Sequence, residues 1–128
     1  MSRKKSREFA FRLVFEKFFH EPDIDIFENM EDFVLDDDDK EFVNSLIDGI
    51  NNHYENIMNI IKDNIEGYEL DRIYKVDLAI LVLAIYELKF ENSTPDKVVL
   101  NEAIELSKKY STDKSFSFIN GVLAKILK

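Results

Sequence analysis

One apolar run limits the folds open to this chain more than any other feature. Its sequence is LAILVLAIY, it covers residues 78–86, and it lies between Asp77 and Glu87. Nine residues are about half the length of a membrane span, so the run predicts a buried helix. We expect a helix from about Ile73 to Phe90 that is apolar nearly all round. Other elements must enclose such a helix, so it should be the central helix of the domain.

The rest of the chain favours an all-α fold. Only three glycines and two prolines interrupt 128 residues, and apolar side chains recur every three to four positions. A chain of this length makes one ordinary domain, so we expect a compact single domain over residues 1–128. Other helices are expected at about 3–20, at 25–35, at 40–65 with a bend near 49–52, and in two C-terminal segments. The residues of the long stretch expected to face inward are Phe42, Leu46, Ile50, Ile57 and Ile61.

Capping residues indicate where some of these helices begin. In the DDDDK run, Asp38 and Glu41 have the spacing of a capping box. Capping explains this run better than a calcium site, because the alternating ligands and glycine turn of a calcium loop are missing. Thr94 is predicted as the N-cap of one C-terminal helix, with Pro95 at its first helical position, and Thr112–Asp113 is predicted to cap the last helix.

Charge is divided unevenly along the chain. The formal net charge is -9, and the sequence pI is ≈ 4.7. Residues 1–20 hold six basic and two acidic side chains, residues 21–77 hold four and eighteen, and residues 78–128 hold seven and six. An anionic partner should therefore meet the two ends of the sequence and avoid its acidic middle.

No pattern of catalytic or metal-binding residues stands out in the sequence. His20 and His53 lack a patterned carboxylate or second histidine nearby, and no phosphate-binding or nucleophile motif occurs. A carboxylate pair among the 26 acidic residues is the one catalytic alternative left open. The absence of cysteine suits a reducing cytosol, and charges interrupt the apolar N-terminal helix too often for a signal peptide. We expect a cytoplasmic protein that is no enzyme and has no catalytic residue, metal or cofactor.

The first helix begins with a cluster of cations. They are Arg3, Lys4, Lys5 and Arg7. The cluster is either a solubilising tail or an arginine-rich arm that binds phosphates and becomes ordered on RNA. Farther along, Glu8, Arg12 and Glu16 are spaced four apart and predict a solvent-facing line. The largely aromatic remainder of the helix is expected in the core.

The last helix places an aromatic residue among cations. The stripe expected to be buried consists of Phe116, Ile119, Leu123 and Leu127. Asn120 falls on the buried side as a structural hydrogen-bonding residue. Phe118 lies on the other face, which it shares with Lys114, Gly121 and Lys125. An aromatic side chain between lysines can stack on a base or anchor a partner protein, and packing against a neighbouring helix is the alternative.

Three segments are specific in combination. They are DRIYKVDLAILVLAIYELKF, VVLNEAIELSKKY and SFSFINGVLAKILK. Together they resemble the NusB family of bacterial transcription antitermination factors, and the basic start with REFAFRLVFE resembles that family's arginine-rich arm and first helix. The likeness covers nearly the whole chain and is strongest from Leu70 onward. It implies a NusB-like domain of about seven helices arranged as two small helical bundles.

The resemblance also implies partners and contact residues. NusB-family factors bind the boxA element of nascent ribosomal RNA transcripts together with NusE, a ribosomal small-subunit protein. That pair joins NusA and NusG on RNA polymerase and suppresses premature termination. Carried over by position, the RNA-binding residues would be Arg3, Lys4, Lys5, Arg7 and Phe118. The partner-binding residues would be Asp77, Tyr110, Lys114 and Phe118.

The chain departs from the family pattern at several positions. Val82 stands where the family usually has an arginine, on a line of the central helix that we expect to be exposed, so a cation is lost there. Lys4 and Lys5 stand where arginines are common, which keeps the charge and loses the bidentate fork to phosphate. Lys114 takes a position that is acidic in some relatives.

The alternative hypothesis is a protein-interaction or homodimerisation module without specific RNA binding. In that case the basic cluster only keeps an apolar first helix soluble. This hypothesis predicts tight self-association and no preference for boxA over scrambled RNA. Neither hypothesis involves a membrane.

Overall fold

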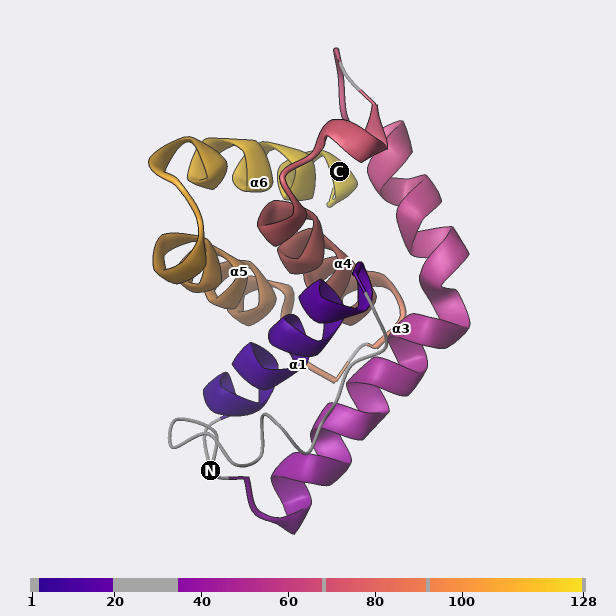
Figure 1. Ribbon diagram of the computed structural model, residues 1–128, viewed down its shortest axis with the longest axis vertical. Helices are drawn as coiled ribbons and strands as arrows, with labels where there is room; N and C mark the ends of the chain where they lie inside the picture. The colour runs from indigo at the N-terminus through magenta and orange to yellow at the C-terminus, as the bar shows by residue number, and fades with distance from the viewer. Residues whose placement is uncertain (1–2, 20–34, 68, 92, 128) are drawn as a thin grey trace.

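Five α-helices make up most of the computed structural model (Figure 1), which describes residues 3–19, 35–67, 69–91 and 93–127. They are α1 (Lys4–Lys17), α3 (Asp37–Asp63), α4 (Lys75–Lys89), α5 (Asp96–Tyr110) and α6 (Asp113–Ile126), with a 3-10 turn, η2 (Leu70–Arg72). These residues contain no strand, so the all-α class is confirmed. About seven helices were expected, and the described ranges hold five. The expected helix at 25–35 lies, except for its last residue, outside them.

α4 is the central helix, as the apolar run predicts. Every residue from Asp77 to Leu88 is buried. α4 packs against α1, α3, α5 and α6, while α1 also pairs with α3 and α5 with α6. α4 is therefore shared by two small helical bundles, which agrees with the expected architecture (Figure 1). None of the helices in the described ranges combines the length and the apolar character needed to cross a membrane.

α3 is a continuous helix of 27 residues, about 40 Å long at 1.5 Å per residue. Four of its predicted inward residues are buried, and Phe42 is only partly buried. The four are Leu46, Ile50, Ile57 and Ile61. Figure 1 shows α3 changing direction near its middle, close to the expected bend. A Cβ atom on Gly49 would overlap the hydroxyl of Tyr86 in α4, so glycine here allows the two helices to approach each other.

The capping box of α3 lies two residues before its predicted place. Asp36 accepts a hydrogen bond from the backbone N–H of Asp39 at 2.8 Å, and the Asp39 carboxylate accepts one from the backbone N–H of Asp36 at 3.3 Å. The predicted pair of Asp38 and Glu41 is therefore wrong. Asp36 has an extended backbone and the helix begins at the next residue, so Asp38 already lies within the first turn.

The predicted N-cap residues of α5 and α6 are confirmed only in part. Pro95, and not Thr94, is the N-cap residue of α5. The Thr94 hydroxyl instead accepts a hydrogen bond from Arg7 at 3.0 Å. Thr112 is the N-cap residue of α6 as predicted, but its hydroxyl contacts that of Ser115 at 3.1 Å and caps no backbone N–H. Contacts with other side chains, one distant and one local, thus occupy hydroxyls that the sequence pattern assigns to helix capping.

One predicted helix face is wrong, and another is confirmed only in part. Val82 is 0% exposed, so the line of α4 through this residue is not a solvent-facing one. In the last helix, Ile119 and Leu123 are buried as predicted. Phe116 is 41% exposed, and Asn120 and Leu127 are exposed as well, so these three assignments are wrong. The buried face of α6 instead consists of Ser115, Ile119, Val122, Leu123 and Ile126. This face is rotated from the predicted stripe, because α6 packs against both α4 and α5.

Candidate nucleic-acid interface

The predicted basic arm separates into exposed and buried cations. Arg3, Lys4 and Lys5 are exposed at the start of α1, with Arg3 as its N-cap residue. The first turn of α1 contains no acidic residue. Cations at a helix N-terminus oppose the helix dipole, so this placement is locally unfavourable for the helix. Helix stability therefore does not account for the basic composition of this first turn.

Arg7 does not face solvent as expected of a phosphate-binding arm. It is 5% exposed, and its partner Glu87 in α4 is 2% exposed. Arg7 Nε donates to Glu87 Oε1 at 2.9 Å and to Oε2 at 3.1 Å, and Arg7 Nη2 donates to the hydroxyl of Thr94. Burial raises the pKa of the Glu87 carboxyl, and the Arg7 guanidinium offsets part of this rise. Arg7 therefore ties α1 to the end of α4 and to the residue just before the N-cap of α5.

The start of α1 is also tied to the start of α3. The Ser6 hydroxyl donates to Asp39 Oδ1 at 3.2 Å. The guanidinium carbon of Arg3 lies 4.3 Å from the centroid of the Phe42 ring, and that of Arg7 lies 5.5 Å from the same centroid. One aromatic ring thus faces both an exposed and a buried arginine. Sequence reasoning placed Phe42 in the core and had no signal for this contact.

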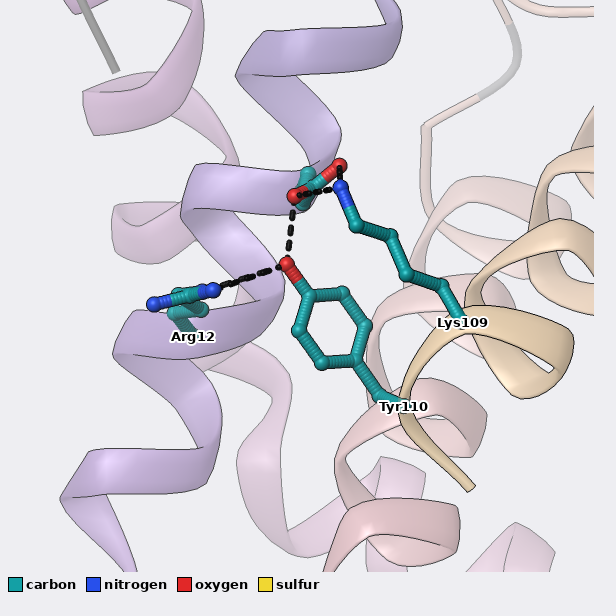
Figure 2. A network of polar contacts seen from close by, with 4 residues as sticks. Arg12, Lys109 and Tyr110 are labelled. Carbon is teal, nitrogen blue, oxygen red and sulfur yellow. Dashed lines mark hydrogen bonds and ion pairs between the residues drawn. The ribbon is translucent and has the colours of Figure 1, made fainter. Parts of the chain in front are cut away.

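Two charges of the line on α1 that was expected to face solvent, Glu8 and Arg12, are part of a network with α5 (Figure 2). Glu8 is buried, and Lys109 Nζ lies 2.8 Å from its Oε2. The Tyr110 hydroxyl donates to Glu8 and accepts from Arg12 Nη2 at 3.0 Å. Burial would raise the pKa of Glu8, but the hydrogen bonds and charge of Lys109, with the Tyr110 hydroxyl, hold it below its usual value. Burial and the Glu8 contact raise the pKa of Tyr110.

An aromatic groove lies between α1, the start of α4 and the end of α5. Its volume is about 540 Å³. It is lined by Phe11, Arg12, Phe15, Glu16, Phe19, Val76 and Tyr110. Phe19 is 61% exposed. The three phenylalanines are spaced four apart, which places them along one side of the helix, yet this regular spacing was interpreted as core packing alone.

A second groove lies between η2, the start of α4 and the start of α6, with a volume of about 400 Å³. We call it the α4–α6 groove. It is lined by Arg72, Ile73, Tyr74, Asp77, Thr112, Lys114, Ser115 and Phe118. Asp77 is buried and accepts hydrogen bonds from the hydroxyls of Ser111 and, at 2.8 Å, Ser115. Lys114 is exposed and Phe118 is partly buried.

The structure brings most of the predicted partner-binding residues together. Asp77, Lys114 and Phe118 line the α4–α6 groove, and Tyr110 lines the aromatic groove next to it. The arm lies elsewhere, because Arg7 contacts Glu87 near the other end of α4. Ten residues of helix separate Asp77 from Glu87, about 15 Å along the axis. The predicted residues therefore form two contact regions, and Phe118 belongs to the region away from the arm.

Proteins similar in sequence match this chain over almost its whole length. The sequence model of the NusB family matches residues 4–128. The transcription antitermination protein NusB of Clostridium botulinum (strain Loch Maree / Type A3) is 43% identical over 142 residues, covering 99% of this chain and 100% of that protein. The protein of the same name from Finegoldia magna is 42% identical over 132 residues, covering 100% of this chain and 95% of that protein.

Solved structures share the fold over the same length. T. maritima NusB has a TM-score of 0.86 at 35% identity, covering 98% of this chain and 90% of that one. A crystal structure of antitermination factors NusB and NusE in complex with dsRNA contains a chain with a TM-score of 0.83 at 27% identity. That match covers 97% of this chain and 94% of the other.

Proposed function

The chain belongs to the NusB family, and from this premise we propose that it is a transcription antitermination factor that binds boxA RNA of nascent ribosomal RNA transcripts together with NusE. The observation that carries the proposal is the exposed cation cluster of Arg3, Lys4 and Lys5 on a chain of net charge -9. An acidic protein repels RNA over most of its surface, so its contact with RNA must be local.

We assign RNA phosphates to the exposed cations at the start of α1. A relative of the same fold has been solved with NusE and dsRNA, which supports the choice of partners. The burial of Arg7 and its ion pair with Glu87 argue that this arginine positions the arm and does not itself bind phosphate. Lys4 and Lys5 carry charge but no planar fork, so they act as point charges, and Arg3 alone offers a bidentate contact.

We assign NusE to the α4–α6 groove. Asp77, Lys114 and Phe118 line this groove, and Tyr110 lies beside it. Its lining combines an apolar ring with charges of both signs, as protein–protein interfaces commonly do. Phe118 is partly buried and could serve either partner, because RNA that crosses from the arm toward α6 would also reach its ring.

A role in binding RNA and NusE also implies the larger complex in which the chain would act. The RNA-bound pair would join NusA and NusG on RNA polymerase in the cytoplasm and would suppress premature termination there. Binding of this kind requires no catalytic residue, metal or cofactor, so we propose that the chain is no enzyme.

The test is a titration of labelled boxA RNA at several salt concentrations, with and without NusE. Three cations that each neutralise one phosphate of a single strand contribute about -2 to the slope of log affinity against log salt. Replacing Arg3, Lys4 and Lys5 by alanine should weaken binding and flatten the slope by that amount. A control that replaces Lys62, which is exposed near the far end of α3, should leave the slope unchanged.

The rival hypothesis is a protein-interaction or homodimerisation module without specific RNA binding. The exposed Phe19 in the aromatic groove supports it, because an apolar groove can accept a second copy. Under this hypothesis boxA and scrambled RNA bind equally well, the arm substitutions change neither slope nor affinity, and sedimentation shows a tight dimer. A preference for boxA that disappears in the arm variant rejects it.

A further inference from the structure

The Phe42 ring lies at the junction of α1 and α3 and faces Arg3 and Arg7 at once. The two guanidinium carbons lie 4.3 and 5.5 Å from its centroid, within the range of cation–π contacts. Phe42 itself is partly buried and packs against the core, so the ring does not depend on the arginines for its position. An exposed cation of the arm therefore rests on a surface that the fold holds in place.

The elements that carry the ring and the arm are fixed to each other on both sides of this contact. Arg7 is held by Glu87 and Thr94. Ser6 donates to Asp39, which is part of the capping box at the start of α3. Because these contacts hold the start of α1 in place, the remaining freedom of Arg3 is rotation about its side-chain torsions. Contact with the Phe42 ring restricts that rotation as well. Its exposed guanidinium is thus partly ordered before any ligand arrives.

The contact with the ring leaves hydrogen-bond donors of Arg3 accessible. A guanidinium that rests on a ring uses its flat face, while its N–H donors lie along its edge. Arg3 Nη1 contacts the backbone carbonyl of Asp38 at 3.5 Å, the outer limit of a hydrogen bond. Most of the edge can therefore form the paired hydrogen bonds that a phosphate accepts.

We propose that Phe42 is a positioning residue for RNA binding: its ring pre-orders the Arg3 guanidinium, so that phosphate meets an arginine that has already lost part of its rotational freedom. This inference rests on the proposed function, because it concerns how the arm binds RNA. Ordering a long side chain on binding weakens affinity, and a side chain ordered beforehand avoids that loss. Phe42 acts through Arg3 and needs no contact with RNA.

The test combines substitutions at Phe42 and Arg3 in titrations of boxA RNA with the full chain. Phe42→Leu keeps an apolar side chain and removes the ring, and should weaken binding roughly two- to five-fold. The salt slope should stay unchanged, since no cation is lost. Phe42→Tyr keeps the ring and should bind like the unmodified protein. In the Arg3→Ala background, Phe42→Leu should have no further effect.

Two controls separate positioning from general damage to the fold. Phe90→Leu removes another partly buried ring, which stacks on His53 at 4.3 Å, and should leave RNA binding unchanged. NMR of the free, unmodified protein tests the contact without any substitution. The ring current of Phe42 should shift the Arg3 Hδ resonances upfield, and unshifted resonances overturn the proposal even if Phe42→Leu fails to fold.

The outcomes distinguish this inference from the function on which it rests. If the Arg3, Lys4 and Lys5 variant binds boxA RNA as well as the unmodified chain, the proposed function fails and the inference fails with it. If that variant loses affinity while Phe42→Leu binds normally, the inference alone is overturned. The same holds if the effects of Phe42→Leu and Arg3→Ala simply multiply.

Discussion

Replacing Glu87 by alanine should destabilise this protein far more than removing an exposed ion pair. The two side chains of the Arg7–Glu87 pair are 7% and 2% exposed. The substitution removes the carboxylate that faces Arg7 Nε at 2.9 and 3.1 Å and leaves the guanidinium charge inside the fold. Breaking a buried pair in this way costs about 3–5 kcal/mol of unfolding free energy. Domains of this size are stable by about 5–15 kcal/mol, so the loss is a large fraction of the total.

A double replacement separates the cost of an unpaired charge from the net value of the pair. Arg7→Met combined with Glu87→Leu fills the same space with apolar side chains. Replacing buried ion pairs in this way is often neutral or stabilising, by up to about 4 kcal/mol. We therefore expect the double variant to be at least as stable as the unmodified protein, while either single truncation is much less stable.

The assay is urea unfolding at neutral pH followed by circular dichroism. The dependence of the unfolding free energy on urea should stay constant, because the surface exposed on unfolding changes little. The matched control is Glu66→Ala, which breaks a pair with Lys125 whose side chains are 85% and 44% exposed. That change should stay within about 0.5 kcal/mol. A loss below about 1 kcal/mol in Glu87→Ala would refute the reasoning from burial.

Three further substitutions test other contacts. Gly49→Ala should lower stability by about 1–3 kcal/mol in thermal unfolding, because its Cβ would overlap Tyr86; a rise in Tm, as helix propensity alone predicts, would contradict this. Burial alone would raise the pKa of Glu8, but Lys109 and Tyr110 hold it below the usual 4.5. The ionised carboxylate therefore contributes fully to stability above pH 4.5, and this contribution is lost as the pH falls through the lowered pKa of the folded state. Glu8→Gln should therefore make the free energy of unfolding depend less steeply on pH below 4.5 in urea titrations, and an unchanged slope would count against the network. Tyr110→Phe removes the hydroxyl that donates to Glu8 and should cost about 0.5–1.5 kcal/mol by the same measurement, whereas no loss would show that the charges alone hold the pair.

Helix positions were predictable where a single physical signal dominated. The run at 78–86 is apolar on every side, and only a central position can bury all of it. The inward residues of α3, such as Leu46 and Ile57, follow from regular spacing over many turns. The helix starts were less predictable, because several acidic residues in a row offer neighbouring caps of similar strength. In the structure Asp36 is the cap, so α3 starts at Asp37.

The candidate site was predictable as a set of residue types and less so as a geometry. The cluster of Arg3, Lys4, Lys5 and Arg7 is visible in sequence because charge does not depend on the fold. The burial of Arg7 was not predictable, because a helical wheel contains no information about Glu87, which lies 80 positions away. Phe116 was misplaced because the face of α6 is set by two packing partners at once.

The sequence by itself determined the helical class, the central helix, the uneven charge and the family. Each of these depends on local pattern or composition, which the chain carries in any conformation. Only the tertiary structure decided which cations face solvent, which carboxylates are paired, and that Phe42 lies beneath Arg3. Burial and pairing are properties of distant segments brought together. Charged residues that lie close together in sequence can therefore differ in the fold: Arg3 is exposed, whereas Arg7 is buried in an ion pair.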